Sequence, residues 1–324
     1  MINVGIVGYG NLGRGVCLAV DKAPDMNCVG IFTRRDPSSI KPIIDVNVYS
    51  TDELEKFIGK VDVMILCGGS ATDLPANTEN VLKNFNTVDS FDTHAKIPEY
   101  FAKLDKVAKE NGKLGAISIG WDPGLFSVAR MIFSAALPDG EDYTFWGKGV
   151  SQGHSDAIRR IKGVKNAIQY TIPKEEALAA VRSGSCPNLT VRDKHLRECF
   201  VVAEDGADKA YIEKSIKEMP NYFADYDTIV HFISEEELKQ NHSKLSHGGF
   251  VLRSGKTSDG VSHLLELSLK LDSNPQFTGS VLTAYARAIA KLAKEGKTGV
   301  LTVFDIPIKY LSDKSEEFLR SHLL

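Results

Sequence analysis

Two pairs of charged residues stand directly after predicted strands, where ligand-binding side chains of parallel α/β sheets are usually found. Arg34 and Arg35 follow one apolar run, and Asp92 and Asp122 follow two later runs. Guanidinium groups bind phosphate well because they carry a permanent charge and donate hydrogen bonds in a fixed fork. The two aspartates are candidate acids at the mouth of the same site, although from spacing alone either is as easily a helix cap.

The elements that would position these residues follow from hydrophobic periodicity. Short apolar runs alternate with helix-period segments through the first 120 residues, which predicts a Rossmann-type, doubly wound parallel sheet. The expected strands are 2–7, 28–32, 61–66, 87–89 and 114–119, and the expected helices are 12–23, 72–85 and 98–110.

A second α+β domain is expected after Trp121, because the strand candidates there are longer and charged helical stretches separate them. These strands are 200–203, 228–233, 250–254 and 263–271, and we expect them to be antiparallel. A helix over 278–294 and an apolar run over 300–307 close the chain. The predicted division is a cofactor domain over 1–120, with about 296–324 packing back on it, and a substrate and dimerisation domain over 121–295.

The sharpest motif begins directly after the first predicted strand and opens the first predicted helix. It reads Gly8, Tyr9, Gly10, Asn11, Leu12, Gly13. In a dinucleotide site the first glycine permits a tight turn, the second lets a pyrophosphate approach and the third allows close helix packing. An ordinary glycine turn is the alternative, but the strand and helix on either side favour dinucleotide binding.

The end of the second strand indicates which dinucleotide binds. NAD sites usually place an acidic residue there for the ribose 2′-hydroxyl, whereas this chain has Thr33, Arg34 and Arg35. Two guanidinium groups and a hydroxyl suit a 2′-phosphate, so NADP is the predicted cofactor. The alternative is that the arginines are a solvated pair and that Asp36 is the relevant acid.

Three further loops follow strands on the same edge of the sheet and are expected to contact the cofactor. Their candidate residues are Gly69, Ser70, Ala71, Thr72, Ser90, Phe91, Asp92, Gly120, Trp121, Asp122 and Pro123. For the first loop, a plain turn with Thr72 or Asp73 capping the next helix is nearly as good an interpretation.

Composition excludes several classes of protein. The net charge of −3, with Lys and Arg scattered among acids, gives no basic stripe for nucleic acid. The five cysteines are odd in number and form no C-x-x-C pair, which favours reduced thiols and a cytoplasmic location. Asp122, Pro123 and Arg130 interrupt the longest apolar tract, so no membrane span is expected.

Beyond these motifs the chain resembles the meso-diaminopimelate dehydrogenases. The matching strings are 7–14, 30–35, 120–124, 144–147, 151–157, 165–171, 246–249 and 269–275, nearly from end to end. One position departs from the family pattern, since Ser246 stands where the family has proline. This departure lies in the loop directly before His247.

The resemblance implies an NADP-dependent, reversible oxidative deamination at the D-centre of meso-2,6-diaminopimelate. The products are L-2-amino-6-oxopimelate and ammonia, on the route to lysine and cell-wall precursors. It also implies a homodimer. By the resemblance, Asp92 and Asp122 face the reacting amino group as anchors or proton acceptors, and Arg197, Thr171 and His247 hold the distal carboxylate. The resemblance further adds Trp146, Gln152, Gly153 and Asn274 to the pocket and places Trp121 near the nicotinamide.

Simpler interpretations exist for several of these residues. Trp146 suits a core position, and Arg197 alone suits a surface cation on an edge strand. His242 and His247 lack a third ligand at a suitable spacing, so we predict no metal site.

Two other functions remain open at this stage. A dihydrodipicolinate reductase typically has a histidine-rich motif with a catalytic lysine, and a sugar oxidoreductase has Glu-Lys-Pro after its fourth or fifth strand. In that region this chain reads from Asp89 to His94, which argues against both. A non-catalytic NADP-sensing protein would keep the fold and lose the chemistry.

Overall fold

A computed structural model describes residues 1–324 and divides into two compact units. Unit 1 comprises Met1–Val128 and Pro275–Leu324, and unit 2 comprises Ala129–Asn274. These limits differ from the expected 120 and 295, chiefly because the long helix near the end of the chain packs in unit 1.

Unit 1 is a seven-stranded parallel sheet in the order β14-β6-β5-β4-β1-β2-β3, which fits the predicted Rossmann-type class. Its strands are β1 (Ile2–Val7), β2 (Met26–Thr33), β3 (Val48–Ser50), β4 (Val63–Leu66), β5 (Thr87–Asp89), β6 (Leu114–Ala116) and β14 (Gly299–Leu301). Its helices include α1 (Asn11–Asp21), α2 (Asp73–Leu82), α3 (Ile97–Glu110), α10 (Asn274–Lys294) and α11 (Glu316–Leu323), and α4 (Leu125–Ala136) begins in it.

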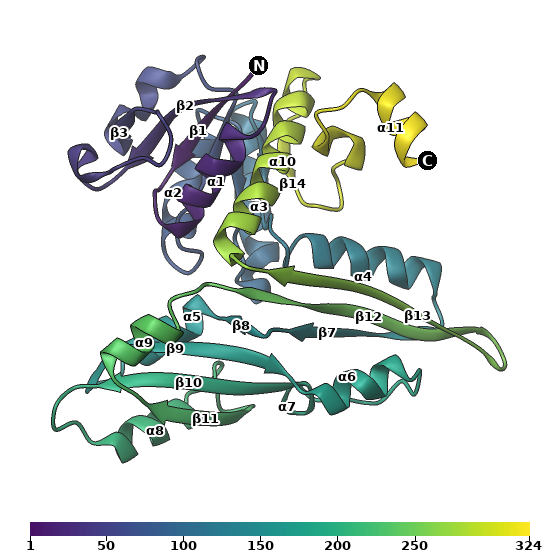
Figure 1. Ribbon diagram of the computed structural model, residues 1–324. Coiled ribbons are helices and arrows are strands. Elements are labelled where there is room, and N and C mark those ends of the chain that lie inside the picture. The colour runs from purple at the N-terminus through teal and green to yellow at the C-terminus, as the bar shows by residue number, and fades with distance from the viewer. The chain divides into compact units, whose positions relative to one another are not determined.

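Two apolar clusters lie on the two faces of this sheet and explain its stability. One joins α1 and α10 to alternate residues of β1, such as Val4 and Ile6 (Figure 1). The other joins α2 and α3 to Met64 and Leu66 of β4. Alternate residues of a strand point to opposite faces, so a sheet with helices on both sides needs the nearly continuous apolar runs seen in the sequence.

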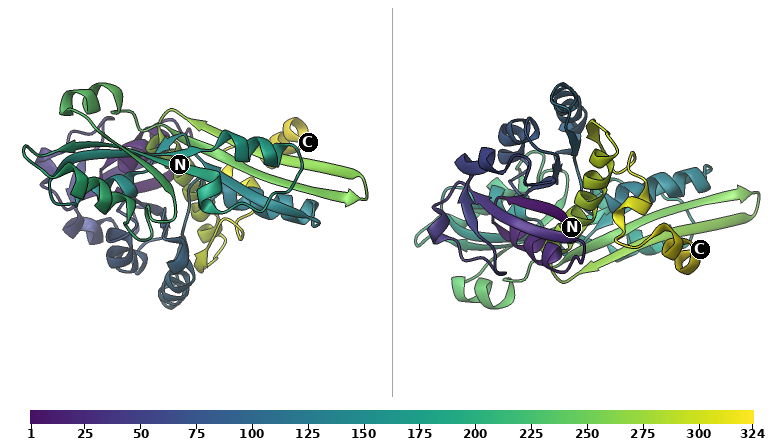
Figure 2. Two further views of the ribbon diagram at one scale, coloured as in Figure 1. Left: turned by 90° about the horizontal axis from the view of Figure 1, so that it is seen from below. Right: turned by 90° about the horizontal axis from the view of Figure 1, so that it is seen from above.

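Unit 2 contains two smaller sheets, in the orders β11-β10-β9-β8 and β13-β12-β7. The strands are β7 (Gly140–Trp146), β8 (Gly149–Val150), β9 (Val164–Pro173), β10 (His195–Ala203), β11 (Asp227–Phe232), β12 (His247–Ser258) and β13 (Val261–Leu271). The helices are α5 (Gln152–Arg159), α6 (Glu175–Arg182), α7 (Val191–Lys194), α8 (Lys209–Lys217) and α9 (Glu235–Asn241). Strands β12 and β13 form a long hairpin, which Figure 2 shows in two views.

Several elements differ from the sequence-based expectation. Strands β3, β7, β8 and β9 were not expected, and β10 begins at His195 rather than at residue 200. Strands β10 and β11 pair in parallel, although an antiparallel domain was expected, because α8 carries the chain back between them. The residues at 114–119 form a strand only as far as Ala116.

Candidate active site

The glycine motif forms a tight turn between β1 and α1. Gly8 adopts a φ of +94°, which side chains other than glycine rarely tolerate, and its N–H donates to the Phe32 carbonyl at 2.8 Å. A Cβ on Gly13 would lie 2.1 Å from the Gly8 carbonyl oxygen, so glycine is required there for packing. Gly10 faces open space, and no side chain caps the start of α1. The N–H groups of this helix end can therefore face an anion.

The two arginines after β2 are held near this turn. Arg35 donates from Nη2 to the Tyr9 carbonyl at 2.6 Å, and Arg34 pairs with Asp73 at 2.6 Å. Thr33 is buried and its hydroxyl oxygen accepts the Arg35 N–H at 3.1 Å. A cavity of about 310 Å³ is lined by Gly8, Arg34, Thr51, Asp52, Asp73 and neighbouring residues.

The alternative role for Asp36 finds no support in its contacts. Its carboxylate caps a short 3-10 turn, accepting from the Ser38 N–H at 3.0 Å and the Ser38 hydroxyl at 2.7 Å. The Asp36 carboxylate thus serves local structure.

Hydrogen bonds hold the loop after β4 in place. The Ser70 hydroxyl accepts the Asp92 N–H at 2.8 Å, which ties this loop to the next one. Thr72 occupies the cap position of α2 without a side-chain cap bond, while Asp73 accepts the Gly69 N–H at 2.9 Å. Asp73 therefore holds the preceding loop, and Thr72 forms no side-chain cap bond to α2.

Asp92 and Asp122 both lie in unit 1, on the loops that follow β5 and β6. The Asp92 side chain is exposed, and the helices that follow begin at caps other than Asp92, so the helix-cap alternative is wrong for this residue. Asp122 is half-buried in a narrow loop closed by a bridge between Trp121 and Gly124.

The other candidate substrate residues lie in unit 2, where strand pairing sets several of them side by side. Gly149 of β8 pairs with Thr171 of β9, and Thr171 pairs with Arg197 of β10. A Cβ on Gly149 would lie 2.3 Å from His247 Cγ, so glycine here leaves room for the imidazole. The three residues expected at the distal carboxylate are thus brought together in one row.

Arg197 is a buried cation on a central strand, so the interpretation as a surface cation on an edge strand is wrong. Its side chain is 5% exposed and donates to the Thr171 hydroxyl, and its guanidinium carbon lies 4.0 Å from the Tyr226 ring centroid. Arg197 Nε has no hydrogen-bond partner, and burial lowers the pKa of the guanidinium. Burying a charge is costly unless an anion compensates it.

The Thr171 hydroxyl adds a hydrogen-bond donor beside Arg197. Its oxygen accepts from Arg197 and lies 3.4 Å from Gln169 Nε2. A hydroxyl has one proton of its own and two lone pairs, so with both lone pairs occupied its proton remains available for an anion.

Trp146 ends β7 and is only partly buried, unlike a core aromatic. The main-chain N–H of Trp146 donates to His195 Nε2 at 2.9 Å, and the rings of the two residues stack with centroids 5.2 Å apart. Burial lowers the pKa of His195 to about 3, and Arg197 adds to this effect. His154 behaves in the same way, with burial and Arg197 lowering its pKa to about 3. Both imidazoles are therefore neutral at ordinary pH, whereas Arg197 is a buried positive charge close to both.

The remaining candidates also lie in unit 2. His247 Nδ1 lies 2.8 Å from the Gly248 nitrogen, and the Asn274 N–H donates to the Leu245 carbonyl at 2.9 Å. Gln152 and Gly153 begin α5 and are exposed. His242 contacts the Tyr170 hydroxyl at 3.0 Å.

Sequence reasoning missed Gln169, His195 and Tyr226. These residues contact Thr171, Trp146 and Arg197, respectively. Gln169 and His195 are fully buried polar side chains on strands. Their signal is alternation, because Gln169 and Thr171 share one face of β9, and His195 and Arg197 share one face of β10. Tyr226 precedes β11 and gave no such signal.

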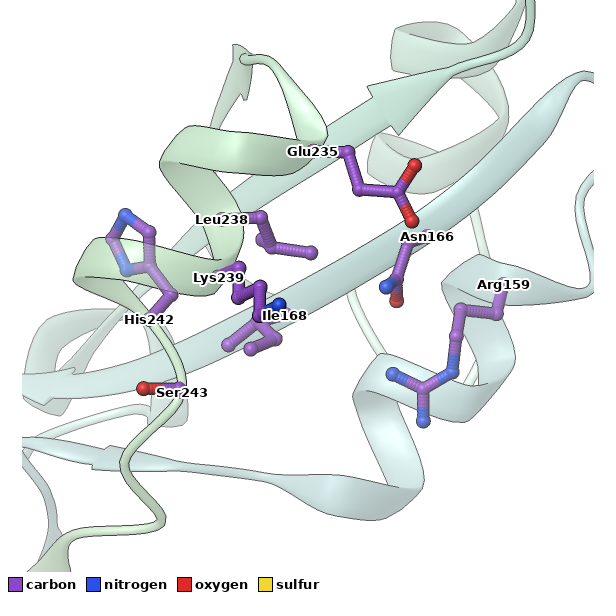
Figure 3. Close-up of a pocket in the computed structure, with 8 residues that line it drawn as sticks. All are labelled: Arg159, Asn166, Ile168, Glu235, Leu238, Lys239, His242 and Ser243. Carbon is purple, nitrogen blue, oxygen red and sulfur yellow. The ribbon is translucent and has the colours of Figure 1, made fainter.

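A separate cavity of about 290 Å³ lies in unit 2 and holds none of the candidate residues. Its lining comes mainly from α5, β9 and α9, including Arg159, Asn166, Lys239 and His242 (Figure 3).

None of the helices is long and apolar enough to cross a membrane.

Comparison with known proteins places these residues in a family. Residues 120–273 match the model of the diaminopimelic acid dehydrogenase C-terminal domain. The meso-diaminopimelate D-dehydrogenase of Ureibacillus thermosphaericus is 59% identical over 323 residues, which are 100% of this chain and 99% of that protein.

Solved structures agree over the whole chain. A mutant meso-diaminopimelate dehydrogenase with diaminopimelate from Clostridium tetani has a TM-score of 0.96 and 54% identity, covering 100% of both chains. An engineered D-amino acid dehydrogenase bound to NADP⁺ has a TM-score of 0.90 and 40% identity, covering 100% of this chain and 99% of that one. The resemblance and the fold class inferred from the sequence are confirmed, and the chain belongs to the family of meso-diaminopimelate D-dehydrogenases, which are amino-acid dehydrogenases.

Proposed function

We propose that this protein catalyses the NADP-dependent, reversible oxidative deamination of meso-2,6-diaminopimelate at its D-centre. The products are L-2-amino-6-oxopimelate, ammonia, NADPH and a proton, and water is consumed. The observation that carries the proposal is Arg197, a buried cation with no paired carboxylate, beside a hydroxyl with a proton to donate. These are the groups that a carboxylate far from the reacting centre requires.

The proposed roles divide between the two units. In unit 1, Asp92 and Asp122 hold the reacting amino group, and one of them, directly or through water, takes its proton. In unit 2, Arg197, Thr171 and His247 bind the distal carboxylate. Trp146, Gln152, Gly153 and Asn274 complete the pocket and exclude substrates of another shape.

The residues of unit 1 fit NADP. The uncapped start of α1, the open space at Gly10 and the cations Arg34 and Arg35 supply donors for a pyrophosphate and a 2′-phosphate. When bound, NADP⁺ supplies the hydride acceptor, which the protein itself lacks. We propose that Tyr9, Asn11 and Leu12 join the glycines in this contact, and that Thr33 approaches the 2′-phosphate. We also propose that Gly69, Ser70, Ala71, Thr72, Ser90, Phe91, Gly120, Trp121 and Pro123 line the rest of the cofactor site.

The direct test is NADP⁺ reduction at alkaline pH with meso-, L,L- and D,D-diaminopimelate, with NAD⁺ as the control cofactor. Reaction of the meso isomer with NADP⁺, and little or none of the L,L isomer, is expected because only a D-centre is attacked. Tight NADP⁺ binding without reduction on any isomer would instead support a non-catalytic NADP-sensing protein.

The cofactor assignment gives a further prediction. Arg34→Ala combined with Arg35→Ala should weaken NADP⁺ binding by about 100-fold, since each charge-assisted hydrogen bond contributes about 1.5 kcal/mol or more. NAD⁺ binding should be unchanged because NAD⁺ has no 2′-phosphate. Fluorescence titration measures both dissociation constants, with Lys83→Ala, directly after α2, as an exposed cation control. Equal losses for the two cofactors would contradict recognition of the 2′-phosphate.

Tyr226 allows a test of how Arg197 is held. Tyr226→Leu removes the ring against which the guanidinium lies and should raise the KM for meso-diaminopimelate by about tenfold, within the range of a buried cation–π contact. Tyr226→Phe keeps the ring and should retain the KM. Steady-state kinetics checks both variants, and an equal rise in the two would show that the hydroxyl, rather than the ring, is what matters.

We also propose a homodimer that works in the cytoplasm. Met131 and Ile132 of α4, and Val261 and Leu264 of β13, are exposed large apolar side chains that a second copy would cover. The five free cysteines are typical of a reducing compartment. Light scattering should give a mass of twice the 35.5 kDa chain.

A further inference from the structure

A buried carboxylate lies beneath the loops that carry both candidate acids. Asp89 ends β5 and is fully buried. Its Oδ1 accepts the N–H groups of Phe91 at 3.0 Å and Ser118 at 3.2 Å, and its Oδ2 accepts the Tyr100 hydroxyl at 2.8 Å. Burial raises the pKa of Asp89 to about 6, although these three donors act in the opposite direction.

The two N–H donors belong to different loops. Phe91 directly precedes Asp92, and Ser118 lies shortly before Asp122 in the loop after β6. The Asp89 carbonyl also accepts the Ile119 N–H at 2.9 Å. Ser118 adopts a φ of +59°, a left-handed conformation that costs energy for a residue with a side chain. One aspartate therefore fixes the start of both loops. One of its two N–H donors is Ser118, whose left-handed backbone conformation requires stabilisation.

Stability alone is a weak reason for this arrangement. A buried carboxylate is costly, and none of the causes that shift the pKa of Asp89 is a neighbouring cation. The carboxylate is instead used as an acceptor that reaches two chain segments at once. Its effect is to fix main-chain positions within a few residues of Asp92 and Asp122.

We propose that Asp89 is a positioning residue that sets the places of Asp92 and Asp122 relative to each other. The inference rests on the proposed function, in which those two acids hold the reacting amino group. Asp89 touches neither substrate nor cofactor, and acts through the N–H groups of Phe91 and Ser118. A displacement of about 1 Å at a reacting group can cost about 100-fold in rate.

The test compares Asp89→Ala with Asp89→Asn. The alanine variant should lower kcat by about 100-fold and weaken NADP⁺ binding by much less, because it loosens the loops that carry the acids and leaves the glycine turn, Arg34 and Arg35 intact. The asparagine variant should retain most of the activity, since its amide oxygen still accepts from both N–H groups. Asp62→Ala is the matched control. Asp62 directly precedes β4, at the amino ends of the strands of the same sheet, and accepts the Asn3 N–H at 2.8 Å.

A double-mutant cycle separates positioning from a general loss of structure. In an Asp122→Asn background, Asp89→Ala should cost much less than it does in the wild type, because the acid that it positions is already disabled. Additive losses, or an alanine variant with wild-type kcat, would overturn the proposal. If the alanine variant does not fold, Asp89→Glu, which moves the carboxylate by one methylene, takes its place with the same expected loss of kcat.

Hydrogen exchange distinguishes failure of this inference from failure of the proposed function. Peptides covering 90–92 and 117–122 should exchange faster in Asp89→Ala than in wild type, whatever the substrate of the enzyme. Unchanged exchange would overturn the positioning role. Faster exchange in an enzyme that is inactive on diaminopimelate would overturn only the substrate assignment.

Discussion

Replacement of Arg197 by methionine is expected to lower kcat/KM for meso-diaminopimelate by about 1,000-fold, without loss of stability. Removing one partner of a buried charge pair costs about 2–5 kcal/mol in binding, and each 1.4 kcal/mol is tenfold. The free protein, in contrast, contains a buried cation without a paired carboxylate. A methionine of similar length removes that desolvation cost, so the melting temperature should be equal or higher.

Kinetics and thermal unfolding of the same preparation check both halves of this prediction. Arg182→Met is a suitable control, since Arg182 belongs to the same unit and pairs with Glu266 at a more exposed position. A D-amino acid without a distal carboxylate, such as D-norleucine, should not lose activity with Arg197→Met. Unchanged kcat/KM for meso-diaminopimelate would contradict the role of Arg197, and a large fall in melting temperature would mean that the guanidinium is structural.

The cofactor half of the molecule could be predicted because its signals are local. The strand, the glycine turn and the helix from Ile2 to Asp21 are adjacent in sequence, and each glycine has a steric reason that a short motif reveals. The same holds for Arg34 and Arg35, whose position directly after β2 needs no long-range information. Periodicity is sufficient where an element and its partner are neighbours along the chain.

The substrate half could not be built from spacing. Thr171 and Arg197 are 26 positions apart, and only the pairing of β9 with β10 makes them neighbours. Charged residues interrupt β10, so apolar periodicity located only its end, and Arg197 looked like a surface residue. Its role came from the resemblance to a family, and its burial came from the structure.

Asp89 illustrates a further limit of sequence reasoning. Nothing in the order of residues 89–92 distinguishes the aspartate that is buried from the one that is exposed. The distinction depends on Ser118, in the loop after β6, and on Tyr100 of α3, which both donate hydrogen bonds to Asp89. Positioning residues of this kind become visible only when the hydrogen bonds of a buried group are counted.

Asp122→Asn is expected to lower kcat by about 1,000-fold while leaving the NADP⁺ dissociation constant unchanged. Asparagine keeps the size of the side chain but carries no negative charge, so it can neither balance an ammonium group nor take a proton, a loss that typically costs about 10²–10⁴-fold. Asp122 should be the more sensitive of the two acids, because it is half-buried while Asp92 is exposed, and electrostatic interactions are weaker in water. Stopped-flow measurement of NADPH formation, with Asp105→Asn on α3 as a control, checks the prediction. A rise in KM with unchanged kcat would contradict a role in the chemical step and leave Asp122 as a binding residue only, since a group that acts equally on the bound substrate and the transition state changes KM alone.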